Sequence, residues 1–262
     1  MEHDFWKVMP SWKHIGNNSN LPIMDSKIYP NLVSILLPSR QRGQMVLKSI
    51  KSLYDTATHP DKIQLLLKID SDDIDSYIPI LEDISKITNN NYKLVISDKL
   101  EGYFSLNVHY NDLCGVANGE FLLLWNDDAL MDTQDWDATI QNYTNKLCVI
   151  QTSNNHFPWI FPFIHTKLYE LCGYLSPHFA NDTWIHDFAQ TFDIEVYEPN
   201  VLMIHDRYDV TGNNNDSRYV IDDYHIKYDT YMQEYQQILT SEKNRLSESI
   251  RDFMILECEG DI

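Results

Sequence analysis

Short apolar runs alternate with longer segments of helical periodicity through the first half of the chain. Four runs consist mostly of branched or large apolar residues, as in strands buried on both faces of a sheet, at residues 33–37, 63–69, 92–97 and 121–125. Between them, apolar positions recur on one helical face in residues 44–56, 75–87 and 105–117. Helices of this length between strands form right-handed crossovers, so the pattern predicts an α/β fold with a mostly parallel sheet flanked by helices.

The pattern is less regular after residue 128. It predicts helices over 133–143 and 166–172 and from residue 181, a strand over 147–152, and one or two short strands within 194–203. The aromatic segment 154–163 fits either a packed surface loop or the wall of a binding cleft. Residues from 222 to about 256 are charged and helical, and this segment could cover the sheet or support a homodimer.

These patterns divide the chain into three parts. Residues 1–30 are expected to form an N-terminal arm, residues 31–221 the α/β domain, and residues 222–262 a C-terminal helical extension.

Composition narrows the class of protein. With 262 residues and 43% hydrophobic content, the chain is expected to fold as a globule. A net charge of −19 argues against a general binder of nucleic acid or anionic membranes. Four cysteines without CxxC spacing suggest free thiols, and neither a signal peptide nor an apolar run of about 20 residues is visible. We expect a soluble cytoplasmic protein with no integral membrane segment.

Polar clusters follow three of the predicted strands, at residues 38–42, 70–73 and 126–128. The carboxyl ends of parallel strands meet at one edge of a sheet, so the clusters should converge there. Guanidinium groups in the first cluster are suited to donate hydrogen bonds to phosphate oxygens. Carboxylates in the second cluster could accept hydrogen bonds from a nucleobase or a ribose hydroxyl. The adjacent carboxylates of the third fit either a solvated turn or a divalent metal. Together they suggest a nucleoside diphosphate held by a hard cation.

The order of these segments resembles the nucleotide-sugar glycosyltransferases with the GT-A (Rossmann-like) fold, specifically family 2. The similar segments are residues 33–40, Leu53, Pro60, 69–73, Asn107, Asn111, 117–120 and 126–128. They cover about the first half of the chain and are specific as a set. The second half is similar only through Gly173, Asn181-Asp182 and His205.

The resemblance implies roles for individual residues. Pro38, Ser39, Arg40 and Arg42 would line the nucleotide pocket, Asp70 would contact the base (usually uracil), and Asn107, Asn126 and Asp127 would bind the rest of the donor. Asp128 and His205 would ligate Mn²⁺ or Mg²⁺.

The resemblance also implies that Asp182 is the catalytic base, with Asp187 in reserve. Two departures weaken these assignments. The family commonly has Glu-Asp where this chain has Asn181-Asp182, and Asp-x-Asp where it has Asn126-Asp127-Asp128. Asp182 also fits an ordinary acid in the first turn of a helix.

The predicted function is metal-dependent transfer of a sugar, with inversion, from a UDP-sugar to a hydroxyl group of a glycan or another acceptor. One alternative is a nucleotidyltransferase of similar layout, disfavoured because the loop after the first strand contains only one glycine, Gly43. A second alternative is a non-catalytic module that binds a nucleotide sugar or a glycan.

Overall fold

The computed structural model describes residues 27–100, 102–207 and 224–259. Its strands are β1 (Tyr29–Pro38), β2 (Ile63–Asp70), β3 (Tyr92–Ser97), β4 (Gly119–Leu124), β5 (Ala129–Met131), β6 (Val149–Asn154), β7 (Phe163–His165) and β8 (Glu195–His205). Its α-helices are α1 (Gly43–Asp55), α2 (Leu81–Ile87), α3 (Leu106–Cys114), α4 (Trp136–Gln141), α5 (Thr166–Cys172), α6 (Asn181–Phe192) and α8 (Tyr224–Glu259). The α/β class predicted from the sequence is confirmed.

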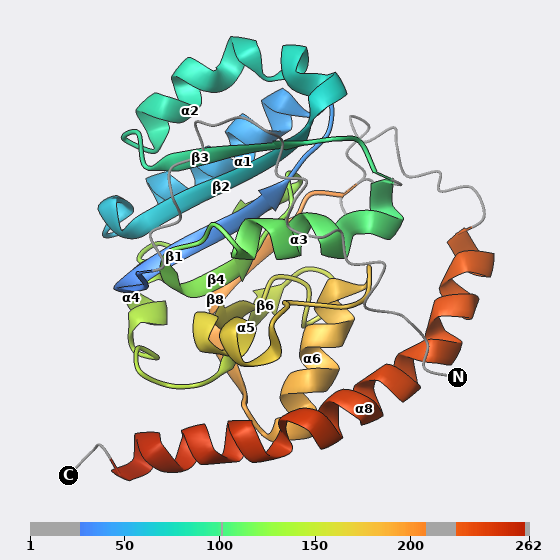
Figure 1. Cartoon of the computed structure of the whole chain (residues 1–262). Coiled ribbons are helices and arrows are strands. Elements are labelled where there is room, and N and C mark those ends of the chain that lie inside the picture. Colours follow the sequence, from blue (N-terminus) through green and yellow to red (C-terminus); the bar gives the residue numbers. More distant parts are fainter. Residues whose placement is uncertain (1–26, 101, 208–223, 260–262) are drawn as a thin grey trace.

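The strands form one sheet in the order β3-β2-β1-β4-β7-β6-β8-β5 (Figure 1). In its first half β1 pairs with β2 and β4, and β2 pairs with β3, all in parallel. Every residue of β2 and β4 is buried, which explains why each contains consecutive apolar residues without polar alternation. All four strands of this half were predicted from the sequence.

The second half of the sheet is mixed. The strand β7 is antiparallel to β4 and β6, while β8 is parallel to β6 and antiparallel to β5. Both β5 and β7 were missed because three residues are too short to show a period. The segment expected to hold one or two short strands is one strand of 11 residues, with a register shift opposite Thr152 and Ser153.

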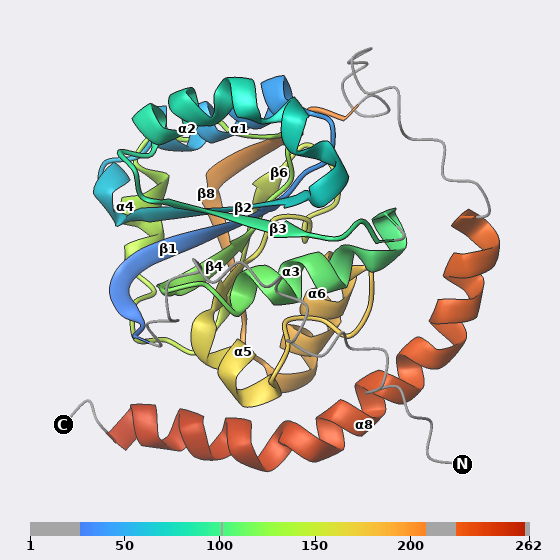
Figure 2. The same ribbon diagram turned by 45° about the horizontal axis from the view of Figure 1, so that its top comes forward.

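Helices cover both faces of the sheet, α1, α2 and α4 on one face and α3, α5 and α6 on the other, with α8 outside α5 and α6 (Figure 2). The helix expected over residues 75–87 is instead two 3₁₀ segments, Ser71–Ser76 and Ile78–Ile80, followed by α2. Pro79 lies in the second segment, where it cannot donate a backbone hydrogen bond within a longer α-helix.

The long helix α8 packs its middle against the layer that α5 and α6 form (Figure 1). Tyr235, Leu246 and Ile250 are buried in the same apolar cluster as α6. The Arg245 guanidinium donates a 3.0 Å hydrogen bond to the carbonyl oxygen of Cys172 at the end of α5. The C-terminal extension therefore covers the domain, and its use in a homodimer stays a prediction.

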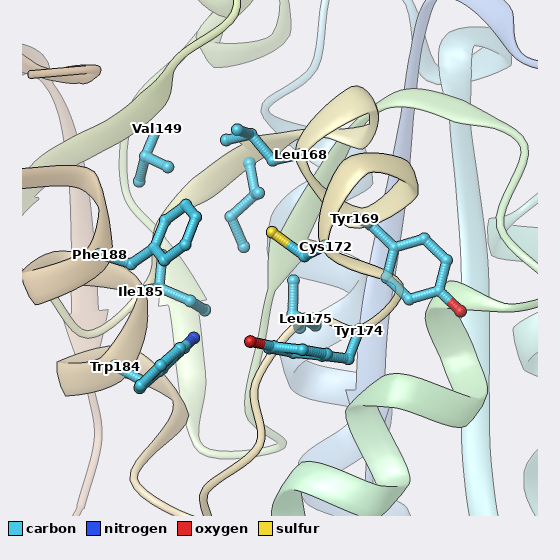
Figure 3. Close-up of a pocket in the computed structure, with 10 residues that line it drawn as sticks. Val149, Leu168, Tyr169, Cys172, Tyr174, Leu175, Trp184, Ile185 and Phe188 are labelled. Carbon is cyan, nitrogen blue, oxygen red and sulfur yellow. The ribbon is translucent and has the colours of Figure 1, made fainter. Parts of the chain in front are cut away.

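A small apolar cavity of about 20 Å³ lies between α5, α6 and the face of the sheet at β6 and β7 (Figure 3). Trp184, Ile185 and Phe188 of α6 and Leu168 and Cys172 of α5 line it. None of the predicted site residues does so, and the cavity is a gap in core packing rather than a polar ligand site. In the described ranges, no helix combines the length and the apolar character needed to cross a membrane.

The packing of α8 predicts the effect of trimming its buried face. Leu246→Ala should lower the free energy of unfolding by about 2–5 kcal/mol, because a side chain that is 2% exposed would leave a cavity. The exposed neighbour Glu248→Ala should change it by less than about 0.5 kcal/mol. Urea unfolding measures both values, and equal midpoints for the two variants would contradict docking of α8 on the core.

Candidate functional site

The three predicted polar clusters meet at the carboxyl ends of β1, β2 and β4. The strand β1 lies between the other two, so the direction of strand order reverses beside it, where open α/β sheets bind ligands. Pro38 ends β1, and the next backbone N–H, that of Ser39, donates to the Lys68 carbonyl of β2 at 2.9 Å. The Ser39 hydroxyl donates to Asp127 Oδ2 at 2.6 Å, so the first and third clusters are in direct contact.

The loop after β1 is held in a strained conformation. Gln41 has a φ of 56°, in the left-handed region that costs a residue other than glycine roughly 1–2 kcal/mol. Its N–H donates to the carboxylate of Asp73, which offsets that cost. The Tyr77 hydroxyl donates to Ser39 Oγ at 2.7 Å and fixes the loop from the other side. The second polar cluster and the segment after it therefore shape the first.

Arg40 crosses from this loop to the second cluster. Its guanidinium donates to Asp70 Oδ2 at 2.7 Å and to Asp72 Oδ2 at 2.9 Å. Asp70 is nearly buried, whereas Asp72 is exposed. The loop thus presents a positive group and a shielded carboxylate side by side at the end of β2.

Arg42 lies beside both of the adjacent carboxylates in the third cluster, and His205 lies beside Asp128 alone. Arg42 Nη1 lies 2.9 Å from Asp127 Oδ1 and 3.6 Å from Asp128 Oδ2. Burial raises the pKa of Asp127 to about 6, although Arg42 acts in the opposite direction. Burial also acts to raise the pKa of Asp128, but His205 and Arg42 outweigh it and hold that pKa below its ordinary value.

His205 reaches this cluster through the short strand β5. The antiparallel register of β5 and β8 places Ala129 opposite His205, and the Asp206 N–H donates to the Asp128 carbonyl at 2.7 Å. His205 Nε2 then lies 3.3 Å from Asp128 Oδ1. The structure therefore brings together the two residues that the sequence predicted as metal ligands.

The Asp128–His205 pair fits two sites on a divalent cation. Adjacent ligands of an octahedral ion with bonds of about 2.1 Å lie about 3 Å apart, close to the observed 3.3 Å. Within the described residues neither Asp128 Oδ1 nor His205 Nδ1 makes a hydrogen bond. No group of three or more His, Cys, Asp or Glu side chains there is arranged for a metal.

Tyr110 is a site residue that the sequence analysis missed. Its hydroxyl lies 2.8 Å from Asn126 Oδ1 and 2.9 Å from the Trp125 carbonyl, and it fixes the turn that precedes Asp127. Burial raises the pKa of Tyr110, and the negative charges of Asp182, Asp127 and Asp128 add to this effect. The sequence could have indicated Tyr110, because it follows the predicted site residue Asn107 by three positions and therefore lies on the same face of α3. Asn107 itself is partly exposed on the first turn of α3.

The two candidate bases on α6 have different surroundings. Asp182 lies in the first turn of α6, where burial raises its pKa and the nearby His205 acts to lower it. Asp187 instead accepts a 2.6 Å hydrogen bond from Tyr235 of α8. Asp182 is therefore within electrostatic range of His205, whereas Asp187 is tied to the C-terminal helix.

Asn111 of α3 positions the loop that leads to Asp182. Its Nδ2 donates to the Ser176 carbonyl at 2.7 Å, and its Oδ1 accepts from the Leu175 N–H at 2.6 Å. Tyr110 and Asn111 thus connect one helix to both the carboxylate turn and the start of α6.

The arrangement of strands is similar to that of solved nucleotide-sugar transferases. The mannosyltransferase PcManGT from Pyrobaculum calidifontis, in complex with GDP-Man and Mn²⁺, aligns over 68% of this chain with a TM-score of 0.54 and 13% identity. S. aureus TarS 1–349 aligns with a TM-score of 0.51 in complex with UDP (14% identity, 66% of this chain) and with UDP-GlcNAc (15% identity, 72% of this chain). The fold is that of GT-A-like glycosyltransferases.

The likeness to these structures extends to the fold alone. This GT-A-like chain spans 59%, 60% and 62% of the three matched chains, about three-fifths of their length. No family model matches its sequence, and no curated protein does either.

Two basic residues of this GT-A-like chain, Lys68 of β2 and His109 of α3, are buried close enough to interact electrostatically. Lys68 is 1% exposed, and its ammonium group pairs with the carboxylate of Asp112 in α3. His109 of the same helix is also buried, and burial together with the charge of Lys68 lowers its pKa to about 3. His109 is therefore neutral in the folded protein at any pH well above 3.

The lowered pKa of His109 predicts a loss of stability in acid. Below about pH 6.5 the unfolded chain protonates His109, while the folded protein does not until the pH approaches 3. Between pH 7 and pH 5 the wild type should therefore lose about 2 kcal/mol more unfolding free energy than His109→Phe. Urea unfolding at both pH values measures this difference, and parallel losses in the two proteins would contradict a depressed pKa.

Proposed function

We propose that this chain is a glycosyltransferase that moves a sugar from a UDP-sugar to an acceptor hydroxyl group with the help of a divalent cation. The observation that carries the proposal is the convergence of Arg40 and Asp70 with Asp127, Asp128 and His205 at the point where the strand order reverses. A nucleoside diphosphate needs the same combination of groups, namely polar partners for the base and ribose, and positive charge for the phosphates.

The donor would lie across the ends of β2, β1 and β4. Asp70 accepts from the base, and Asp127, already bonded to the Ser39 hydroxyl, accepts from a hydroxyl of the ribose or the sugar. Arg40 and Arg42 supply donors for phosphate oxygens, and both side chains are partly exposed at this rim. Their present carboxylate partners hold them in place before the donor arrives.

Asp128 and His205 would hold Mn²⁺ or Mg²⁺. When bound, such a cation neutralises charge that builds on the departing diphosphate, an effect usually worth several kcal/mol. PcManGT, whose fold is similar, was solved with Mn²⁺ and GDP-Man, which supports the same use here.

Asp182 would act as the general base. It accepts the proton of the acceptor hydroxyl while the oxygen bonds to the anomeric carbon and the bond from that carbon to UDP breaks. The products are the glycoside, UDP and one proton. Its raised pKa increases the basicity of the carboxylate, which favours proton transfer from a weakly acidic hydroxyl. A single displacement of this kind inverts the anomeric centre.

Donor binding predicts a thermal shift that depends on metal. UDP at 100 times its dissociation constant should stabilise the protein by about 2.7 kcal/mol, or roughly 5–10 °C. Mn²⁺ should enlarge the shift and EDTA should reduce it. His205→Ala should remove the Mn²⁺ increment and keep a shift with UDP alone, because it deletes one predicted ligand. Equal shifts with Mn²⁺ and with EDTA in the wild type would exclude a metal role in binding.

Catalysis predicts a specific loss on neutralising Asp182. Asp182→Asn should lower kcat for transfer by roughly 10²–10⁴-fold, since general-base catalysis contributes on that scale, and should leave the UDP thermal shift unchanged. Asp187→Asn is the matched control, because asparagine still offers an acceptor to Tyr235. UDP release and glycoside formation are measured together. Undiminished transfer by Asp182→Asn would overturn the base assignment, and pyrophosphate release would point to a nucleotidyltransferase.

A further inference from the structure

Five aromatic side chains form a continuous strip that starts at the predicted metal pair. The members of this aromatic strip are His205, His156, Phe157, Trp159 and His186, in that order. Neighbouring ring centres lie between 4.3 and 6.0 Å apart. Trp159 stacks on Phe157 and on His186, with interplanar angles of 17° and 9°. The strip therefore begins at β8, follows the loop after β6 and ends on α6.

The strip is not part of the hydrophobic core. Phe157 is 54% exposed and Trp159 is partly exposed, while Trp125, Trp136 and Trp184 fill the core and are at most 1% exposed. A contiguous group of exposed rings with polar residues at its edge is typical of a binding surface. The sequence left open whether this segment is a packed surface loop or a cleft wall, and the exposure of Phe157 favours the second.

The strip ends beside the proposed base. His186 follows Asp182 by four residues, so both side chains lie on one face of α6. His186 Nδ1 lies 2.7 Å from Glu195 Oε1, and the Gln151 amide donates to the same oxygen at 2.8 Å. Glu195 and Gln151 thus provide polar groups at the His186 end of the aromatic strip, and the predicted metal ligands lie at its other end.

We propose that the aromatic strip binds the acceptor and that the acceptor is a neutral saccharide. Sugar rings present apolar C–H faces that stack on aromatic rings, and their hydroxyls need polar partners at the edges. The strip offers both, and the carboxylate of Glu195 beside His186 together with the net charge of −19 disfavours an anionic acceptor. The strip runs from His205 to α6, the helix that carries Asp182, so a saccharide on Phe157 and Trp159 would lie between His205 and that helix. The inference rests on the proposed function, because it names the acceptor class of that reaction.

Direct binding tests the inference without any transfer. Maltohexaose, cellohexaose and chitohexaose serve as neutral saccharide probes, added to full-length protein labelled with 5-fluorotryptophan. The ¹⁹F resonance that is missing in Trp159→Phe belongs to Trp159, and it should shift with at least one probe. Phe157→Leu keeps an apolar side chain but removes the ring, and it should weaken binding of that probe about tenfold.

The controls separate this inference from the proposed function. Tyr29→Leu removes a partly exposed ring at the start of β1, at the opposite end of that strand from the site, and should not change saccharide binding. The UDP thermal shift should be the same in all variants. If no probe moves the Trp159 resonance, or if Phe157→Leu binds as tightly as the wild type, the saccharide inference is wrong even where UDP still binds. Saccharide binding without a UDP shift would instead overturn the proposed function.

Discussion

Two neighbouring carboxylates buried at the end of one strand are the constraint on which the site depends. Asp127 and Asp128 are 8% and 7% exposed, and two such charges repel each other unless each has its own partner. Asp127 receives the Ser39 hydroxyl and Arg42, while Asp128 faces His205. These partners come from the loop after β1 and from the end of β8. Compensating one pair of charges therefore draws together segments that lie more than 160 residues apart.

The parts of this arrangement that the sequence predicted are those governed by local pattern. The strands β1, β2 and β4 each contain a run of apolar residues and end at acidic or basic residues, so their parallel pairing alone places Ser39, Asp70 and Asp127 at one rim. The same pattern revealed α5 and α6. The roles assigned to single residues came from the family resemblance, and local pattern contributes nothing to them.

The parts that local pattern alone could not predict depend on contacts distant in the chain. His205 reaches Asp128 because β5 pairs with β8 in one register, and a strand of three residues leaves no visible period. The sequence analysis did not name Tyr110, whose hydroxyl contacts Asn126 only through the fold. The tie between Asp187 and Tyr235 likewise required the path of α8.

The two halves of the site also differ in how they are held. The groups proposed for the donor follow strands inside the parallel sheet, where the backbone ladder determines their positions. The aromatic strip and Asp182 depend instead on loops and on single anchors such as Asn111. Loops over a rigid sheet can change without disturbing it. This division suits a transferase in which the donor chemistry is constant and the acceptor varies.

Charge couples donor and cation in such a site. The chain carries a net charge of −19, so a nucleoside diphosphate approaches a protein of its own sign. Three nearby cationic side chains already pair with carboxylates. Arg40 pairs with Asp70 and Asp72. Arg42 pairs with Asp127, and Lys48 pairs with Asp206. Phosphate oxygens would have to compete with those carboxylates for the arginines. A divalent cation on Asp128 and His205 would add positive charge beside Arg42 and weaken its hold on Asp127. The guanidinium could then turn to the diphosphate, so each ligand would make the rim more favourable for the other.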